Sequence, residues 1–337
     1  MFKRALLALL MALPAAAQTT PQPPAAERPL QTLPVERPFQ ALREVRLLCG
    51  FAPGGTCDLL ARLLAEQLTP IIANRVVVEN RTGASGMLAG EAVARAAPDG
   101  HTLLITPMAL TSVLPVTPGL RMPFDPDREL TPISSVANVY NLLVVSPASP
   151  YRSVADIIAA ARAQPGRLSY ASTGNGTSQH LSGALFQRLT GVEMLHVPFR
   201  GGAPAMVEIT AGRVDMMFGN MPEFLGQIRD GGLRALAYGA PRASPLMPAL
   251  PVIGESLPGF EIRSWFGLSG PGGMPPAMVA AWLAALRQVG ANPDFQRRMA
   301  ENAMEITIDD PTAFRTVIAE DRARWAEVIR LANIRGD

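Results

Sequence analysis

Apolar segments of strand length, each followed by a glycine-rich loop and an amphipathic helix, recur along this sequence. The first such unit runs from Leu47 to Leu68: an apolar strand ends at Pro53, and the apolar residues of the next helix recur every three or four positions. Further glycine-rich loops lie at 83–86, 174–176 and 201–202. Alternating strands and helices of this kind predict an α/β fold in which helices cover both faces of a parallel sheet.

The same patterns predict the other elements in chain order. Strands are expected at 75–79, 101–105, 140–146, 168–171, 195–199, 214–218, 233–237 and 264–268. Helices are expected at 88–97, 153–163, 179–189, 276–290, 293–302 and 311–331, together with one that has Pro204 in its first turn. Proline-rich sequence at 114–132 separates the third strand from the fourth.

The length of 337 residues exceeds what one hydrophobic core usually organises, so two lobes are expected. The first lobe is predicted to combine 43–142 with 264–337, and the second to comprise 143–263. The strand at 264–268 returns the chain to the first lobe in this scheme. Two crossings between lobes are typical of a hinge.

The first 17 residues have the features of a secretory signal peptide. Lys3 and Arg4 precede an apolar run, and the alanines at 15–17 match the small residues of a cleavage site. Residues 18–42 are rich in proline and are expected to form a disordered tether. Since no later segment reaches about 18 uninterrupted apolar residues, the sequence predicts an exported, periplasmic protein without a membrane span.

Charge and cysteine content exclude several classes of function. Loss of Lys3 and Arg4 with the signal peptide lowers the formal net charge from +2 to zero, which leaves no basic excess to bind nucleic acid or an anionic membrane. Cys49 and Cys57 flank the first glycine-rich loop, and we expect two separate thiols, with a disulfide as the alternative. The cysteines and three scattered histidines show no metal-ligand spacing, so neither a metal nor a cofactor is predicted.

The glycine-rich loops are the predicted binding site for a small anion. Gly54 and Gly55 let the backbone approach a ligand, and Thr56 or Asp58 is expected to cap the helix that follows. The N-terminus of that helix offers unpaired amide donors and a partial positive charge. Because the loop lacks the P-loop pattern, a carboxylate is favoured over a nucleotide. The hydroxyls expected to add hydrogen bonds to it are those of Thr56, Thr173, Thr177 and Ser178.

A secreted hydrolase is the alternative from a different class, with Cys57 or Ser178 as nucleophile and His180 as base. The sequence contains no Gly-x-Ser-x-Gly elbow and no clear order of nucleophile, base and acid. We therefore expect a receptor without catalytic activity, in which His180 caps or lines the cleft. Such a receptor feeds a transporter or, in a further alternative, signals to a sensor protein.

Eight short motifs follow one another in the order of one known family. They are FAPGGTCD (51–58), VENR (78–81), APDG (97–100), YASTGNGTSQHL (170–181), VPFRGGAPA (197–205), GRVDMMF (212–218), LRALA (233–237) and SWFGL (264–268). On these motifs, the chain from about residue 45 onward resembles the Bug-family (TctC-like) periplasmic solute-binding proteins of tripartite tricarboxylate transporters.

The resemblance implies a type II periplasmic-binding-protein fold, in which two α/β lobes joined by two crossing strands close over a carboxylated solute. It also implies delivery of the solute to one large and one small integral membrane subunit, by a receptor that we expect to be a monomer. The predicted ligand-binding residues are Phe51, Ala52, Gly54, Gly55, Thr56, Asp58, Thr173, Gly174, Asn175, Gly176, Thr177, Ser178, His180 and Asn220.

Ligands of the family include citrate, other dicarboxylates, acidic amino acids, nicotinate-like compounds and terephthalate. This sequence departs from the family pattern at Met87, Met108 and Gly219, and we expect these residues to make the cleft less polar. The departures therefore predict a ligand with an apolar or aromatic body rather than citrate. Trp265 is interpreted as core packing or as a wall of the cleft.

Overall fold

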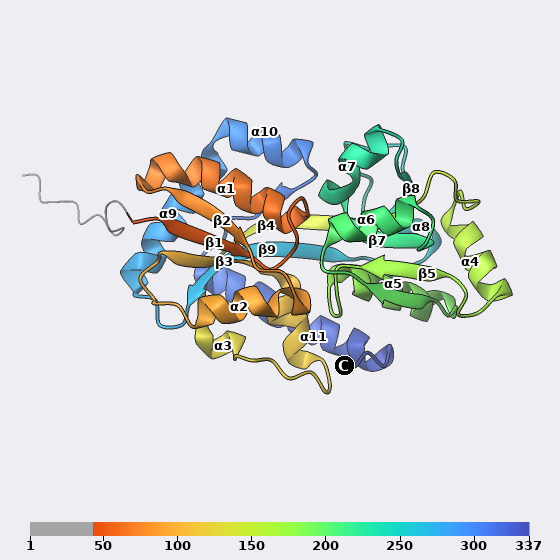
Figure 1. Cartoon of the computed structure of the whole chain (residues 1–337), viewed down its shortest axis with the longest axis horizontal. Coiled ribbons are helices and arrows are strands. Elements are labelled where there is room, and N and C mark those ends of the chain that lie inside the picture. Colours follow the sequence, from red (N-terminus) through yellow and green to blue (C-terminus); the bar gives the residue numbers. More distant parts are fainter. Residues whose placement is uncertain (1–42, 337) are drawn as a thin grey trace, which may run out of the picture. The chain divides into compact units, whose positions relative to one another are not determined.

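A computed structural model describes residues 43–336 (Figure 1). The signal peptide predicted at 1–17 and the tether predicted at 18–42 both lie outside the described residues. Within 43–336, no helix has the length and apolar content needed to cross a membrane.

Apart from β4, which is longer, and β10, which was not predicted, the strands lie close to their predicted positions. They are β1 Val45–Cys49, β2 Val76–Asn80, β3 Thr102–Pro107, β4 Leu130–Val145, β5 Ser169–Ser172, β6 Leu195–Pro198, β7 Met216–Asn220, β8 Arg234–Tyr238, β9 Arg263–Pro271 and β10 Glu305–Ile306.

The predicted helices are all present, whereas α7 and several short helical turns were not predicted. The helices and turns are α1 Thr56–Ile72, η1 Ala84–Gly86, α2 Met87–Ala94, η2 Ala109–Val113, η3 Leu114–Val116, α3 Pro126–Glu129, α4 Val154–Ala163, α5 Ser178–Thr190, α6 Gly202–Thr210, α7 Met221–Arg229, α8 Ile253–Ser256, α9 Pro276–Ala291, α10 Pro293–Glu301 and α11 Pro311–Leu331.

The strands of the described residues form one sheet in the order β2-β1-β3-β9-β4-β7-β5-β6, and β8 and β10 also pair with β4. Strands β1, β2 and β3 are parallel to one another, and so are β5, β6 and β7. We call these groups the first and the second half-sheet. The antiparallel strands β4 and β9 lie between them in the strand order, as the two predicted crossing strands require.

Strand β4 is much longer than predicted. Its first part pairs with β9 and its last five residues, 141–145, pair with β7, so this strand belongs to both groups. The sequence hides the part before Tyr140, because Pro132 interrupts it and the register with β9 shifts near Pro132 and again near Ser135. Propensity identified only the second part of this strand.

Alternating side chains of the strands enter cores on opposite faces of the sheet. In the first half-sheet, Leu47 packs with α1 and α9, whereas its neighbour Leu48 packs with α2. In the second, Met216 packs with α5, and Met217 with α6 and α7. Figure 1 shows α1 and α2 on opposite sides of the strands. The prediction that helices cover both faces is confirmed.

Candidate solute pocket

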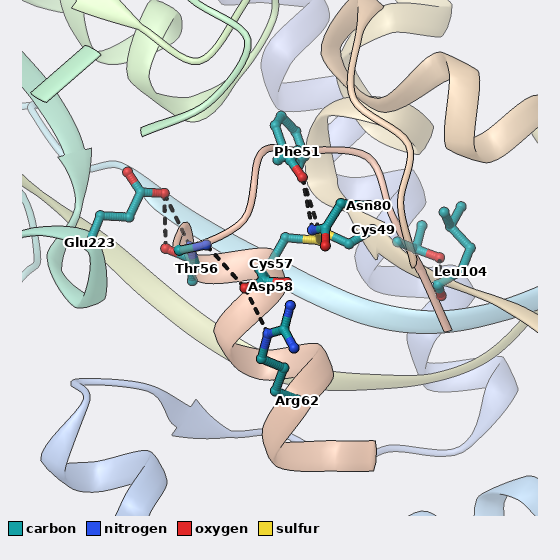
Figure 2. Close-up of a disulfide and its surroundings, with 11 residues drawn as sticks. Cys49, Phe51, Thr56, Cys57, Asp58, Arg62, Asn80, Leu104 and Glu223 are labelled. Carbon is teal, nitrogen blue, oxygen red and sulfur yellow. Dashed lines mark hydrogen bonds and ion pairs between the residues drawn. A yellow bond between two sulfur atoms is a disulfide. The ribbon is translucent and has the colours of Figure 1, made fainter. Parts of the chain in front are cut away.

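The loop after β1 is closed by a disulfide between Cys49 and Cys57 (Figure 2). The expectation of two separate thiols is wrong. Cys49 ends β1 and Cys57 lies in the first turn of α1, and the tight loop between them brings their Cα atoms to 6.0 Å. The Asn80 side chain at the end of β2 donates to the Phe51 carbonyl oxygen at 3.1 Å and holds the loop from the neighbouring strand.

The N-terminus of α1 lacks the predicted cap by the side chain of Thr56 or Asp58. Its N-cap residue is Gly55, and neither Thr56 nor Asp58 caps the first turn. The Asp58 carboxylate instead accepts from the Gly54 amide at 3.0 Å and from Arg62 Nε at 2.9 Å. Burial alone raises the pKa of Asp58, but the hydrogen bonds from Arg62 and Gly54 outweigh it and lower this pKa below its ordinary value. Asp58 therefore holds the glycine loop.

A carboxylate from the other half of the sheet reaches the N-terminus of α1 (Figure 2). Glu223 Oε1 accepts from the Thr56 hydroxyl at 3.0 Å and from the Thr56 amide at 3.4 Å. Glu223 lies in the first turn of α7, directly after β7. Burial raises the pKa of Glu223 to about 7, although the bonds from Thr56 oppose this shift. The position predicted for a ligand anion is occupied by a protein carboxylate.

Glu223 was missed by the sequence reasoning, which singled out only Asn220 in this segment. A signal was present: an acidic residue three positions beyond the carboxyl end of a buried strand lies where α/β sheets bind ligands. Nothing in the sequence connected it to Thr56, which is 167 residues away.

The loop between β5 and α5 faces this site from the second half-sheet. Its hydroxyls donate within the protein: Thr173 Oγ1 to Gln179 Oε1 at 3.0 Å, and Thr177 Oγ1 to the Gly174 carbonyl at 2.7 Å. No side chain caps the N-terminus of α5. The loop is also tied to the first half-sheet, because Ser85 Oγ donates to the Asn175 carbonyl at 2.7 Å.

A cavity of about 20 Å³ lies where these segments meet. Of the predicted residues, those that line it are Phe51, Gly55, Thr56, Thr173, Thr177, Ser178 and Asn220. The lining residues that the prediction lacked are Cys57, Pro107, Ala109, Gln179, Gly202, Glu223, Ser264 and Phe266. The predicted residues outside this lining are Ala52, Gly54, Asp58, Gly174, Asn175, Gly176 and His180. The volume suits about one water molecule.

A second cavity of about 250 Å³ adjoins the first, since Phe51 and Thr173 line both. Gly174 and Asn175 line this second cavity, and so does the cationic side chain of Arg200.

His180 lines neither of these two cavities. Its ring stacks on His196 with centroids 4.1 Å apart, and its Nδ1 accepts from the Gly176 amide at 3.1 Å. Burial, with a smaller contribution from His180, lowers the pKa of His196 to about 3. Of the two predicted roles, capping the cleft or lining it, the bond to the Gly176 amide agrees with capping, and His180 lines a third cavity instead.

The structure does not bring together the nucleophile and base that the hydrolase alternative requires. Cys57 is bridged and offers no thiol, and Ser178 Oγ is directed to Gln179 Oε1 at 3.3 Å and Asn141 Oδ1 at 3.5 Å. Trp265 is core: it is 1% exposed, and its Nε1 donates to Asp321 at 2.6 Å. Within residues 43–336, no three His, Cys, Asp or Glu side chains gather as a metal site requires.

Two of the three departures thought to make the cleft apolar lie elsewhere. Met108 belongs to a hydrophobic core, and Gly219 lies against Phe224, whose ring leaves no room for a Cβ there. Met87 lines the second cavity. The apolar walls of the first cavity come from other residues, among them Phe51 and Phe266.

Comparison with known proteins gives one consistent result. Residues 60–334 match the model of the tripartite tricarboxylate transporter family receptor, TctC. The protein BugT of Bordetella pertussis is 33% identical over 302 residues, covering 88% of this chain and 91% of BugT.

Two solved structures are similar throughout. Rpa4515 of R. palustris with adipate has a TM-score of 0.84 and 33% identity, covering 87% of this chain and 98% of that one. MatC from Rhodopseudomonas palustris with bound malate has a TM-score of 0.80 and 29% identity, covering 85% and 99%. The fold is that of periplasmic binding proteins, in a family of non-catalytic transporter receptors. The chain belongs to the TctC family of tripartite tricarboxylate transporter receptors.

Proposed function

We propose that this protein is a periplasmic receptor that captures a small carboxylate and delivers it to a transporter with one large and one small membrane subunit. Two similar structures hold adipate and malate, which supports a carboxylate as the ligand. Export by the signal peptide predicted at 1–17 and action as a monomer are parts of this proposal.

The observation that carries the proposal is the meeting of two helix N-termini from different half-sheets at one cavity. Thr56 of α1 and Ser178 of α5 both line it, and both stand in a first turn. Such turns supply backbone donors and a partial positive charge that favour an anion. In α5 no side chain uses these donors as a cap, so they suit a ligand carboxylate.

Capture requires the two sides to separate and close again. A cavity of about 20 Å³ is far smaller than a dicarboxylic acid, and the two sides are joined by the two hydrogen bonds from Thr56 to Glu223 at this cavity and by the one from Ser85 to Asn175 at the adjoining cavity. We propose that these contacts break when the ligand enters, with the lobes divided at 43–142 plus 264–337 and 143–263. Phe51 and Phe266 then enclose the apolar body of the ligand.

Native mass spectrometry of the mature protein, purified from the periplasm without refolding, tests the proposal. We expect a retained small acid that is lost on denaturation, with a mass that identifies its class. A thermal-shift panel of aliphatic and aromatic carboxylates follows. Failure of every carboxylate to bind would contradict the receptor function, and tighter binding of citrate than of all aromatic acids would contradict the apolar ligand.

A further inference from the structure

We propose that Glu223 determines the specificity of this pocket, and that the ligand presents a cationic nitrogen to Glu223 while its carboxylate binds at the N-terminus of α5. The inference rests on the proposed receptor function and narrows its ligand to amino carboxylates or related zwitterions.

Two buried acceptor atoms of the pocket have no donor at hydrogen-bond distance within residues 43–336, although the nearby Asn220 side chain opposes the rise that burial causes in the pKa of the Glu223 carboxyl. Glu223 as a residue is partly exposed, but its Oε2 atom is buried and has no hydrogen-bond partner. Asn220 is 3% exposed, and its Oδ1 atom is likewise buried without a partner. Both residues line the small cavity. Buried acceptors are costly unless a donor meets them, so the pocket requires a ligand or a water molecule that donates.

Three hydroxyls of the cavity lining already donate within the protein and do not meet this need. Thr56 donates to Glu223 Oε1, Thr173 to Gln179 Oε1, and Thr177 to the Gly174 carbonyl. A hydroxyl that has used its proton in this way offers a ligand only its lone pairs. This side of the pocket thus presents acceptors.

The charge of the pocket points in the same direction. With Cys57 bridged, Glu223 is the one ionisable side chain among the described residues that line the small cavity. Its carboxylate occupies the donors of Thr56, so a ligand carboxylate placed there would meet a like charge instead of a helix N-terminus. An ammonium group would instead be attracted and would donate to Oε2.

The other end of the ligand has a different environment. The first turn of α5 has no side-chain cap, and Arg200 lines the adjoining cavity. A carboxylate at this end gains backbone donors and a nearby positive charge. The two cavities, which share Phe51 and Thr173, thus have an acidic and a basic end.

Gly202 is the structural partner that makes room for Glu223. It is the first residue of α6, and a Cβ added there would lie 2.7 Å from Glu223 Oε2. The side chain of Glu223 reaches its position only because this residue has none.

The test compares pairs of ligands by isothermal titration calorimetry. Each pair consists of an α,ω-dicarboxylate and the ω-amino carboxylate of equal chain length, from four to eight atoms. We expect the amino carboxylate of the best-fitting length to bind at least tenfold more tightly than its dicarboxylate. Glu223→Gln should reduce this preference by ten- to a hundredfold, because it removes the charge but retains an acceptor for Thr56. Glu208→Gln, at a partly exposed carboxylate paired with Arg213 and outside the cavity linings, is the control and should leave the preference unchanged.

The outcomes separate the two proposals. Tighter binding of dicarboxylates, or a preference that survives in Glu223→Gln, would overturn this inference and leave the receptor function standing. Binding of neither series, nor of any carboxylate in the wider panel, would overturn both. An unchanged circular dichroism spectrum verifies that the Glu223→Gln variant is folded. A lost preference then reports on ligand recognition and not on unfolding.

Discussion

Glu223 and Thr56 form the most informative single contact in this protein, because a buried carboxylate oxygen shares the donors of a helix N-terminus with no positive side chain in the cavity lining. The charged groups around it are the ion pair of Asp58 with Arg62 on α1, and Arg200 ahead of α6. None of these is among the residues that bond the Glu223 carboxylate, so burial dominates its pKa.

This contact predicts a pH dependence of stability. Since the pKa of Glu223 is raised from 4.5 to about 7 in the folded protein, the folded state binds more protons between these values than the unfolded state. The favourable contribution of Glu223 to the free energy of unfolding is therefore complete below pH 4.5 and is lost as the pH rises through 7. In Glu223→Gln this pH-dependent decrease in the free energy of unfolding, which reaches up to about 3 kcal/mol, should be absent.

Urea unfolding of both proteins at pH 5, 6, 7 and 8 measures this effect. The free energy of unfolding of the variant, relative to that of the unmutated protein, should increase as the pH rises. Glu208→Gln serves as control, because Arg213 lowers the pKa of that carboxylate and places its titration below this range. Parallel pH profiles for Glu223→Gln and the unmutated protein would refute the prediction.

Among elements, the unit of β1, its loop and α1 is held in three ways: by the disulfide, by Asp58 bonded to the Gly54 amide, and by Asn80 bonded to the Phe51 carbonyl. The glycine loop is thus constrained at both ends, which keeps the amides at the start of α1 oriented before any ligand arrives.

Reduction of the disulfide should destabilise this unit. A closed loop with a sequence separation of 8 corresponds to roughly 2–3 kcal/mol in the chain-entropy model. Urea unfolding with and without dithiothreitol should show this difference. A variant with both Cys49→Ala and Cys57→Ala should be insensitive to the reductant, because the sequence contains no other cysteine. Equal sensitivity of the variant would show that the reductant acts elsewhere.

Two helical glycines offer a matched pair at the same scale. A Cβ on Gly183 in α5 would lie 2.1 Å from the Tyr170 ring, whereas a Cβ on Gly226 in α7 meets nothing within 4 Å. Gly183→Ala should therefore destabilise the protein by about 1–3 kcal/mol through overpacking. Gly226→Ala should stabilise it by about 0.5–1 kcal/mol, since alanine favours the helix. Thermal unfolding measures both, and equal effects would contradict the packing of α5 on β5.

In the molecule as a whole, the C-terminal helix α11 contributes to a core that it shares with the second half-sheet. Trp325 and Phe314 of α11 belong to the same hydrophobic cluster as Tyr170 and Phe218. Trp265 on β9 donates to Asp321 of α11 at 2.6 Å, which ties the crossing strand to this helix.

Removal of that acceptor should weaken the whole fold. Asp321→Ala leaves the buried Trp265 donor without a partner, and we expect a loss of about 2–4 kcal/mol. Asp321→Asn retains an acceptor and should lose less. Denaturant unfolding followed by tryptophan fluorescence compares the two, and similar losses would mean that the hydrogen bond contributes little.

Much of the fold followed from local sequence patterns. Apolar strands, glycine loops and helix caps such as the Ser153 capping box of α4 depend on neighbours a few residues away, so their positions were predictable. The first part of β4 was not, because Pro132 and two register shifts mask a strand whose pairing with β9 comes from distant residues. Of the site, the loops with Thr56, Thr173 and Ser178 were found in the same local way.

By itself, the sequence determined the α/β architecture, the family and the glycine loops that line the pocket, since each of these is written in short-range patterns and motifs. Only the tertiary structure decided that Cys49 and Cys57 are bridged, that His180 stacks on His196 instead of lining the pocket, and that Glu223 occupies the N-terminus of α1. These features depend on the distances and directions of side chains brought together by the fold, and spacing along the chain carries no information about them.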